Sequence, residues 1–288
     1  MQPKETTELK LDNHSILIAA LEGPFGSGKT AVADEVKNRL VSKGIYTEIY
    51  KLGGLGDNQS MLKNIKSFRV DVERAGTETQ QQKMDRETDR IYHLAAIRQG
   101  RTILNRLSVL PEHAVVLLDR TPFVGYAYTM ALNKNNRNLE TIYAQNLQVA
   151  QKIGIQGVLL FDLSIEEAYA RTLARYFSQD ETVVNKIHDV MQLINAPHAA
   201  ARKIEKRSLE LIATGVIKPR EYDARHFMQY DLAQRQRETY LFAVERGRHD
   251  LGYKLKIINA EKSFLQVVQD STECITRLGQ SPANTKSK

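Results

Sequence analysis

Short runs of apolar residues, each ending in a glycine or an acid, recur along the chain. Residues 15–21 form the first run, and glycines follow it directly. Residues 114–119 and 157–162 repeat the pattern, and both end in an aspartate. A continuous apolar run of this length is typical of a strand buried on both faces of a parallel sheet. The pattern therefore predicts one buried strand near the N-terminus and two further central strands.

Weaker patterns predict two more strands and the helices between them. Residues 44–50 and 253–258 carry the strand patterns. Apolar positions at helical spacing predict helices over 30–42, 80–107, 124–153, 164–176 and 261–278. Strands that alternate with helices indicate an α/β fold, in which a doubly wound parallel sheet of about five strands is flanked by helices.

Local signals mark where single helices begin or break. A polar stretch at 133–137 interrupts the helical pattern over 124–153. Ser164 and Glu167 match a capping box, with Ser164 as the N-cap and Glu167 at the third helical position. We therefore expect a helix that starts at Ser164 and two helical pieces on either side of 133–137.

The segment 179–230 departs from the alternation of strands and helices. It has helical patches over 183–194 and 198–212 and no buried-strand pattern. We interpret it as a helical insertion, or lid, in a core formed by 1–178 and 231–278. The last ten residues, 279–288, are polar and predict a disordered tail.

Composition and charge narrow the class of protein. The chain has 288 residues, of which 42% are hydrophobic and 26% charged, so it can bury a sizeable core. It has one cysteine, Cys274, and no apolar run near the ~20 residues of a membrane span. We therefore expect a cytoplasmic protein with no membrane partner. The net charge of +7 favours an anionic partner, and phosphorylated small molecules satisfy this as well as nucleic acid does.

Residues 23–30, Gly-Pro-Phe-Gly-Ser-Gly-Lys-Thr, match the phosphate-loop pattern G-x-x-x-x-G-K-[ST] between a predicted strand and a predicted helix. In such a loop, backbone N–H groups and the helix dipole attract phosphate. Lys29 should reach the β- and γ-phosphate oxygens, and the Thr30 hydroxyl should bind Mg²⁺. The pattern predicts ATP and Mg²⁺ as cofactors. The expected cofactor-binding residues are Gly23, Pro24, Phe25, Gly26, Ser27, Gly28, Lys29 and Thr30.

Asp119 and Arg120 follow a predicted central strand, so they should lie at the same carboxyl edge of the sheet as the phosphate loop. Asp119 could hold Mg²⁺ through water or orient the attacking oxygen, and Arg120 suits a bidentate grip on an acceptor phosphate. A helix cap is the alternative role for Asp119. We predict Lys29 and Asp119 as catalytic residues, with Thr30 and Asp119 as the metal ligands.

Several segments occur in the order found in the thymidylate kinase family, within the nucleoside and nucleoside monophosphate kinases. These segments are 21–30, 94–98, 118–129, 161–171 and 257–260. The chain resembles this family over 16–178 and 231–275. The resemblance implies a P-loop kinase fold and transfer of the ATP γ-phosphoryl group to a nucleotide, dTMP or a related monophosphate. Because such kinases are often homodimers, it also implies a dimer, formed through core helices or through the insertion.

The resemblance implies roles for five further side chains. Arg98 matches an arginine that reaches the acceptor base, and Arg120 matches one that grips the acceptor phosphate. Tyr128 matches an aromatic that helps wall the acceptor pocket. Arg171 and Arg175 match lid arginines that stabilise charge on the transferring phosphoryl group. All of these residues except Arg120 also have a simpler interpretation: Arg98 as a surface residue, Tyr128 as a core residue, and Arg171 with Arg175 as an exposed basic face.

Three positions depart from the family pattern. Phe25 stands where a carboxylate usually holds the sugar 3′-hydroxyl group, and Leu94 stands where an aromatic stacks on thymine. Lys51 replaces an acid after the second strand, and the arginine that usually precedes it is missing. Phe25 and Leu94 therefore count as acceptor-pocket residues that replace the family's specificity residues and leave the acceptor open, and the donor site is unaffected.

Two other functions fit the same residues. A kinase of a nucleoside or another small hydroxyl compound would need Asp119 to accept a proton, whereas a nucleotide acceptor is already anionic. A P-loop ATPase or switch would bind a protein or nucleic acid through the basic insertion. Residues 171–237 hold twelve Lys and Arg against eight Asp and Glu, but no aromatic platform for bases. We therefore expect a small-molecule phosphate acceptor and no nucleic-acid partner.

Overall fold

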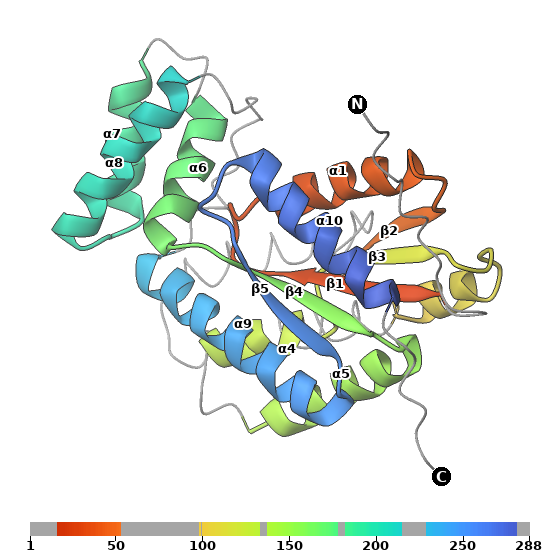
Figure 1. Cartoon of the computed structure of the whole chain (residues 1–288). Coiled ribbons are helices and arrows are strands. Elements are labelled where there is room, and N and C mark those ends of the chain that lie inside the picture. Colours follow the sequence, from red (N-terminus) through yellow and green to blue (C-terminus); the bar gives the residue numbers. More distant parts are fainter. Residues whose placement is uncertain are drawn as a thin grey trace, which may run out of the picture.

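A parallel sheet lies between two layers of helices (Figure 1). The computed structural model describes residues 16–52, 98, 100–132, 137–177, 182–214 and 229–280. The strands are β1 (Leu17–Glu22), β2 (Thr47–Lys51), β3 (Val115–Asp119), β4 (Gly157–Asp162) and β5 (Lys254–Asn259). The helices are α1 (Lys29–Val41), α4 (Val124–Leu132), α5 (Leu139–Ile153), α6 (Ile165–Phe177), α7 (Val183–Leu193), α8 (His198–Ala213), α9 (Tyr230–Leu251) and α10 (Phe264–Gln280).

The sheet has the order β2-β3-β1-β4-β5, and all of its strand pairs are parallel. All six residues of β1 are buried, which explains its continuous apolar run. The predicted central strands β3 and β4 flank β1. Leu21 of β1 pairs with Asp119 of β3, and Glu22 of β1 pairs with Leu160 of β4. The carboxyl ends of the three inner strands therefore meet at one edge.

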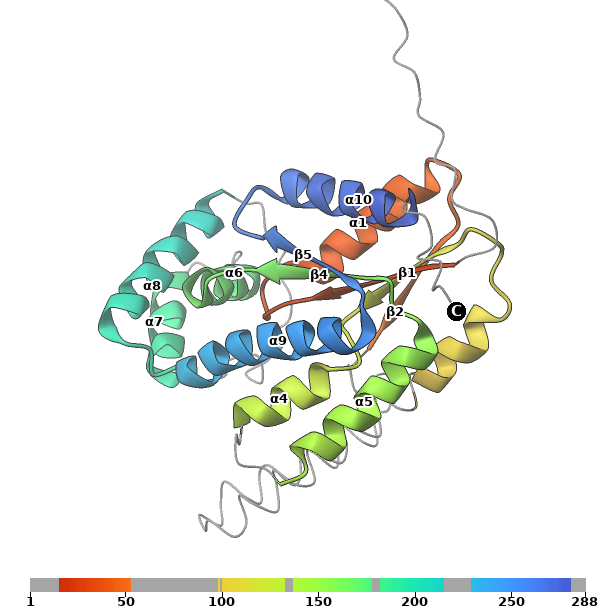
Figure 2. The same ribbon diagram turned by 60° about the horizontal axis from the view of Figure 1, so that its bottom comes forward.

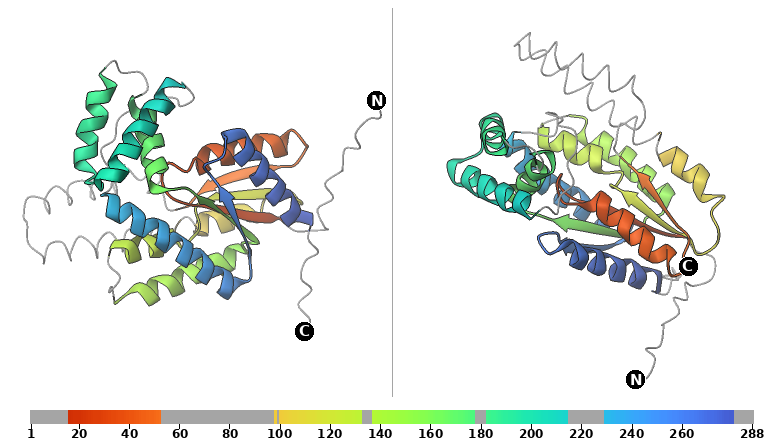
Figure 3. Two further views of the ribbon diagram at one scale, coloured as in Figure 1. Left: turned by 60° about the vertical axis from the view of Figure 1, so that its left-hand side comes forward. Right: turned by 90° about the horizontal axis from the view of Figure 1, so that it is seen from above.

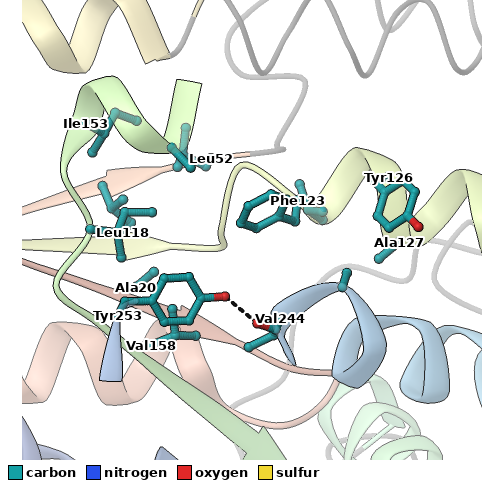
Figure 4. Close-up of a cluster of buried hydrophobic side chains, with 14 of the residues drawn as sticks. Ala20, Leu52, Leu118, Phe123, Tyr126, Ala127, Ile153, Val158, Val244 and Tyr253 are labelled. Carbon is teal, nitrogen blue, oxygen red and sulfur yellow. Dashed lines mark hydrogen bonds between the residues drawn. The ribbon is translucent and has the colours of Figure 1, made fainter. Parts of the chain in front are cut away.

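The side chains of β1 alternate between two apolar clusters. Leu17, Ala19 and Leu21 pack with α1 and α10, whereas Ile18 and Ala20 pack with α4, α5 and α9. Figure 2 shows these two helical layers on opposite faces of the sheet. Figure 4 shows the second cluster in detail. The strand period of two thus divides one apolar run between both faces of the sheet.

α9 is a long helix that the sequence patterns did not predict. It packs along α4 beneath the sheet and reaches the α6–α8 group with its first turns (Figures 1 and 3). The close approach of α9 to Phe123 depends on Gly247, where an added Cβ would lie 2.5 Å from the Phe123 ring. Tyr253 reinforces the packing by donating a hydrogen bond from its hydroxyl group to the Val244 carbonyl (Figure 4). α9 thereby connects the sheet with the predicted insertion.

α7 and α8 occupy the two helical patches expected within the insertion. They pack against α6 and the start of α9 through a third apolar cluster that includes Tyr169, Ile187 and Ile204. The division into core and insertion, and the expected homodimer, stay predictions. Among the described residues, no helix is long and apolar enough to cross a membrane.

The ends of two helices differ from the predictions. Ser164 does cap α6, since its Oγ accepts a hydrogen bond from the Glu167 backbone N–H at 3.4 Å. The capping box is nevertheless one-sided, because the Glu167 carboxylate binds two arginines, and Glu261 accepts from the Ser164 N–H. α10 starts at Phe264 and continues through Gln280. The helix therefore includes residues 279 and 280, which were predicted to belong to the disordered tail.

Some predictions fall largely outside the described part of the chain. Of the predicted helix over 80–107, residue 98 and residues 100–107 are described, and they are helical. The remainder of that prediction, the polar break at 133–136 and residues 281–288 lie outside the described residues.

Candidate active site

The phosphate loop passes so close to neighbouring backbone that two of its positions require glycine. A Cβ on Gly23 would lie 2.6 Å from the Phe161 carbonyl oxygen, and one on Gly26 would lie 2.5 Å from that of Ala168. Both glycines also have positive φ angles, 148° and 73°. β4 and α6 thus hold the loop from one side, which fixes the directions of its N–H groups.

The start of α1 fits an anion. Gly28 precedes the helix without a side-chain cap, and no acid lies in the first turn to neutralise the helix dipole. The Ser27 side chain is buried in the loop, and its hydroxyl oxygen has no hydrogen-bond partner among the described residues. A buried hydroxyl group without a partner is unfavourable unless a ligand provides one. These groups together fit the oxygens of a phosphate.

Lys29 lies folded back inside the loop. Its side chain is buried, and Nζ donates a hydrogen bond to the Pro24 carbonyl at 2.9 Å. Burial is the main cause that lowers the pKa of Lys29 to about 7, and the nearby Arg120 charge lowers it further. Glu22 and Asp119 act in the opposite direction. The lysine is therefore poised to gain a proton when anionic phosphate arrives.

Asp119 and Thr30 form the predicted pair of oxygen ligands. The Thr30 hydroxyl donates a hydrogen bond to Asp119 Oδ2 at 2.7 Å, and Asp119 is buried at the end of β3. Mg²⁺ prefers oxygen ligands of this kind and usually keeps several of its waters. The two side chains therefore fit the role of holding Mg²⁺ beside the phosphate loop.

Glu22, at the end of β1, is a functional candidate that the sequence analysis missed. Its side chain is fully buried, and the carboxylate accepts four hydrogen bonds. Oε1 accepts from the Gly23 N–H at 3.0 Å and from Arg120 Nη1 at 2.9 Å. Oε2 accepts from the N–H and the hydroxyl of Thr121, both at 3.0 Å. Glu22 thus ties the phosphate loop to the end of β3.

Arg120 is held in an unusual backbone conformation. Its φ is 97°, a region that non-glycine residues rarely adopt. The side chain bonds Glu22 and the Gly23 carbonyl, both at 2.9 Å, and the guanidinium carbon lies 5.4 Å from the ring centre of Tyr240. Strain of this kind persists where surrounding contacts fix the residue, and it is concentrated at functional sites.

The fold that carries this site is similar to that of a solved kinase. No protein-family model matches the chain, and no curated protein matches it in sequence. Its structure is similar to a deoxyadenosine kinase from M. mycoides solved with bound dATP, with a TM-score of 0.52 and 15% sequence identity. The match covers 90% of this chain and 99% of that chain. The fold is that of a P-loop kinase. The predicted fold class, a parallel sheet of about five strands flanked by helices, is confirmed.

Within this kinase fold, the two predicted lid arginines have different surroundings. Arg175 lies near enough to Lys29 for its charge to lower the pKa of that lysine. Arg171 instead donates to Glu167 at 2.8 Å, and Arg207 of α8 donates to the same carboxylate at 2.9 Å. Burial acts to raise the pKa of Glu167, but the two arginines hold this pKa below its usual value. Arg171 and Arg207 therefore share the Glu167 carboxylate.

The predicted acceptor residues are spread around this site. Phe25 meets the Tyr169 ring edge-on, with centres 4.9 Å apart, and it packs on the α6–α8 cluster. Tyr128 is half-buried on α4, and Arg98 is exposed on its helix. Leu94 lies outside the described residues. The structure thus brings Lys29, Thr30, Asp119 and Arg120 together at one edge, with Phe25 on the side of the α6–α8 cluster.

ATP affinity should depend on pH through Lys29. Bound phosphate favours the charged lysine, so its pKa rises above about 7 on binding and a proton is taken up. Above pH 7 the affinity should therefore fall, by up to tenfold per pH unit until the pKa of the complex is reached. Titration calorimetry at pH 8.5, in two buffers of different ionisation enthalpy, measures the proton uptake. A Lys29→Met variant that takes up as many protons as the wild type would contradict this assignment.

Proposed function

We propose that the chain transfers the γ-phosphoryl group of ATP to a hydroxyl group of a nucleoside. The observation that carries the proposal is the meeting of three features at one sheet edge. These are the phosphate loop with Lys29, the Thr30–Asp119 pair, and Arg120 fixed beside them. Phosphoryl transfer depends mainly on positioning and on charge stabilisation, and this edge provides both.

Each side chain has a distinct task in the proposed reaction. The loop N–H groups, Ser27 and Lys29 bind the β- and γ-phosphate oxygens of ATP. Thr30 and Asp119 would hold Mg²⁺, which neutralises charge on the phosphate oxygens. Asp119 also orients the acceptor hydroxyl group and accepts its proton as the new bond forms. Arg175, close to Lys29, stabilises negative charge on the transferring group.

The charge balance around Arg120 favours a neutral acceptor over a nucleoside monophosphate. The fully buried carboxylate of Glu22 already neutralises the guanidinium group, which leaves little net charge for an acceptor phosphate. The thymidylate kinase family, which the chain resembles, has an arginine that binds phosphate just before position 51, and Tyr50 stands in its place here. The name of the structural neighbour, a deoxyadenosine kinase, supports the same choice.

A nucleoside monophosphate, dTMP first, is the second candidate. The family segments quoted above favour it, because 21–30 and 118–129 resemble the thymidylate kinase pattern in order and in sequence. Under this alternative Arg120 would have to contact the acceptor phosphate while it stays paired with Glu22. The attacking oxygen would be anionic, so Asp119 would orient it without accepting a proton.

ADP release from ATP·Mg²⁺ across a panel of nucleosides and nucleoside monophosphates tests the proposal. We expect stimulation by at least one nucleoside and loss of that stimulation in a Lys29→Met variant prepared in the same way. Stimulation by monophosphates alone would favour the second candidate. ATP hydrolysis that no nucleoside or nucleotide stimulates would reject the kinase assignment and indicate an ATPase or switch.

A further inference from the structure

The buried face of α9 carries a polar side chain that the proposed mechanism does not use. Tyr230, Ala233, Gln236 and Tyr240 follow each other at helical spacing on this face, and all four are buried. Gln236 is 4% exposed, and its amide nitrogen has no hydrogen-bond partner among the described residues. A buried N–H donor without an acceptor destabilises a fold, so such groups are rare in proteins. A ligand oxygen would complete the missing bond.

The first turn of α9 is anchored on the phosphate-loop side of the site. Tyr230 stacks on Tyr169 with ring centres 6.2 Å apart, and Tyr169 in turn contacts Phe25 of the loop. In Figure 2, this end of α9 lies near α6, toward which the arrowhead of β4 points. The N-terminal part of α9 therefore extends past the carboxyl edge of the sheet, where ligands bind in parallel α/β folds.

A second contact positions α9 beside the end of β3. The guanidinium group of Arg120 packs over the Tyr240 ring at 5.4 Å. With a helical rise of 1.5 Å per residue, Gln236 lies about 6 Å along the axis from Tyr240 and about 9 Å from Tyr230. Along the helix axis, Gln236 thus lies between Tyr230 and Tyr240. With 3.6 residues per turn, its side chain points within about 40° of that of Tyr240, the residue that Arg120 covers.

We propose that the Gln236 amide nitrogen donates a hydrogen bond to a neutral oxygen, a hydroxyl or carbonyl group, of the phosphate acceptor. The proposal rests on the kinase function above and adds a specificity-determining residue to it. Phe25 offers no hydrogen bond on its side of the site, and the Arg120 charge is balanced by Glu22. An uncharged donor between them suits an uncharged polar group of the acceptor. A site built to hydrogen-bond one substrate group discriminates strongly against analogues that lack it.

A Gln236→Met variant tests the proposal, since methionine keeps the length and removes the donor. We expect the acceptor KM to rise about tenfold with the ATP KM unchanged. We also expect the melting temperature without ligand to stay the same or to rise by roughly 2–4 °C, because an unpaired buried group is removed. Gln234→Met is the matched control: Gln234 lies two positions earlier on the exposed face, and both KM values should stay at wild-type levels.

Three outcomes would overturn the proposal. An unchanged acceptor KM in Gln236→Met shows that the amide does not contact the acceptor. A marked fall in the melting temperature shows that Gln236 serves the fold instead. If wild-type protein shows no acceptor-stimulated ATP turnover, the kinase function fails first and the specificity role fails with it. Gln236→Glu, which replaces the donor with an acceptor oxygen, should raise the acceptor KM at least as much as methionine does.

Discussion

Replacing Asp119 by asparagine should lower the rate of phosphoryl transfer about 10³-fold while the protein stays folded. The carboxylate has two proposed tasks: it holds Mg²⁺ with Thr30, and it orients the acceptor hydroxyl group and takes its proton. General-base assistance alone contributes roughly 10²–10⁴-fold, and asparagine keeps the shape without the charge. Oδ1 of the asparagine can still accept the Thr30 hydrogen bond that Asp119 accepts at 2.7 Å, so the local fold should survive. Steady-state kinetics with the best acceptor of the panel measures the loss in kcat.

Asp162 provides a matched control, because it ends β4 as Asp119 ends β3. Its side chain is 49% exposed, and it pairs with Arg237 on the surface. Asp162→Asn should therefore change kcat less than twofold. Equal losses of kcat in both variants would mean that any acid at this sheet edge affects the reaction through the long-range effect of its charge. The specific role of Asp119 would then be rejected.

The features that could be predicted from sequence are contiguous motifs and positions that the parallel sheet brings to one edge. The phosphate loop is contiguous from Gly23 to Thr30, and the inner strands are continuous apolar runs because both of their faces are buried. Asp119 was identified by its position alone, since parallel strands all end at one edge. The loop and the strands are contiguous in the chain, whereas Asp119 meets Thr30 across 89 residues and was predictable only because their strands end at one edge.

The features that were missed depend on contacts between distant residues. Glu22 lies 98 residues from Arg120 and 99 from Thr121, and in the sequence it is a single acid after an apolar run. Glu167 matched a local capping signal, but the carboxylate binds Arg207, 40 residues away in α8. No spacing rule in the sequence reveals a contact between residues so far apart in the chain.

α9 was missed for a different reason. Its buried positions do recur at helical spacing, from Tyr230 through Tyr240 to Gly247, so a periodic signal was present. The buried face, however, carries Gln236 and Thr239 among its apolar residues, and the exposed face holds Leu241 and Phe242 among its charged residues. Polar residues on a buried face weaken the hydrophobic pattern that identifies a helix. They are also where functional side chains are expected, and Gln236 is one of them.

Glu22 shows how the same carboxylate can serve stability and function together. Arg120 adopts a φ of 97° and turns its guanidinium group toward the phosphate loop, an arrangement that needs a fixed partner. A fully buried carboxylate with four donors supplies that partner. The strain at Arg120 and the burial of Glu22 are therefore two parts of one arrangement that fixes the acceptor side of the site.

A Glu22→Gln variant should lose about 3–5 kcal/mol of unfolding free energy, because it leaves the Arg120 charge without its buried partner. For a chain of this size the melting temperature should fall by roughly 10 °C. At a temperature where the variant remains folded, kcat/KM for the acceptor should still be about 100-fold lower, because Arg120 and Thr121 lose their fixed positions. Thermal unfolding and steady-state kinetics on the same preparation measure both effects.

The double variant Glu22→Gln/Arg120→Gln separates the structural effect from the catalytic one. Replacing both charges removes the unpaired buried ion, so the double variant should be about 2 kcal/mol more stable than the sum of the single changes implies. Activity should not recover with stability, because the guanidinium group is then absent from the site. If activity instead followed stability through the cycle, Glu22 would act only on folding. Recovery of stability without activity means that the carboxylate holds Arg120 in the position that phosphoryl transfer requires.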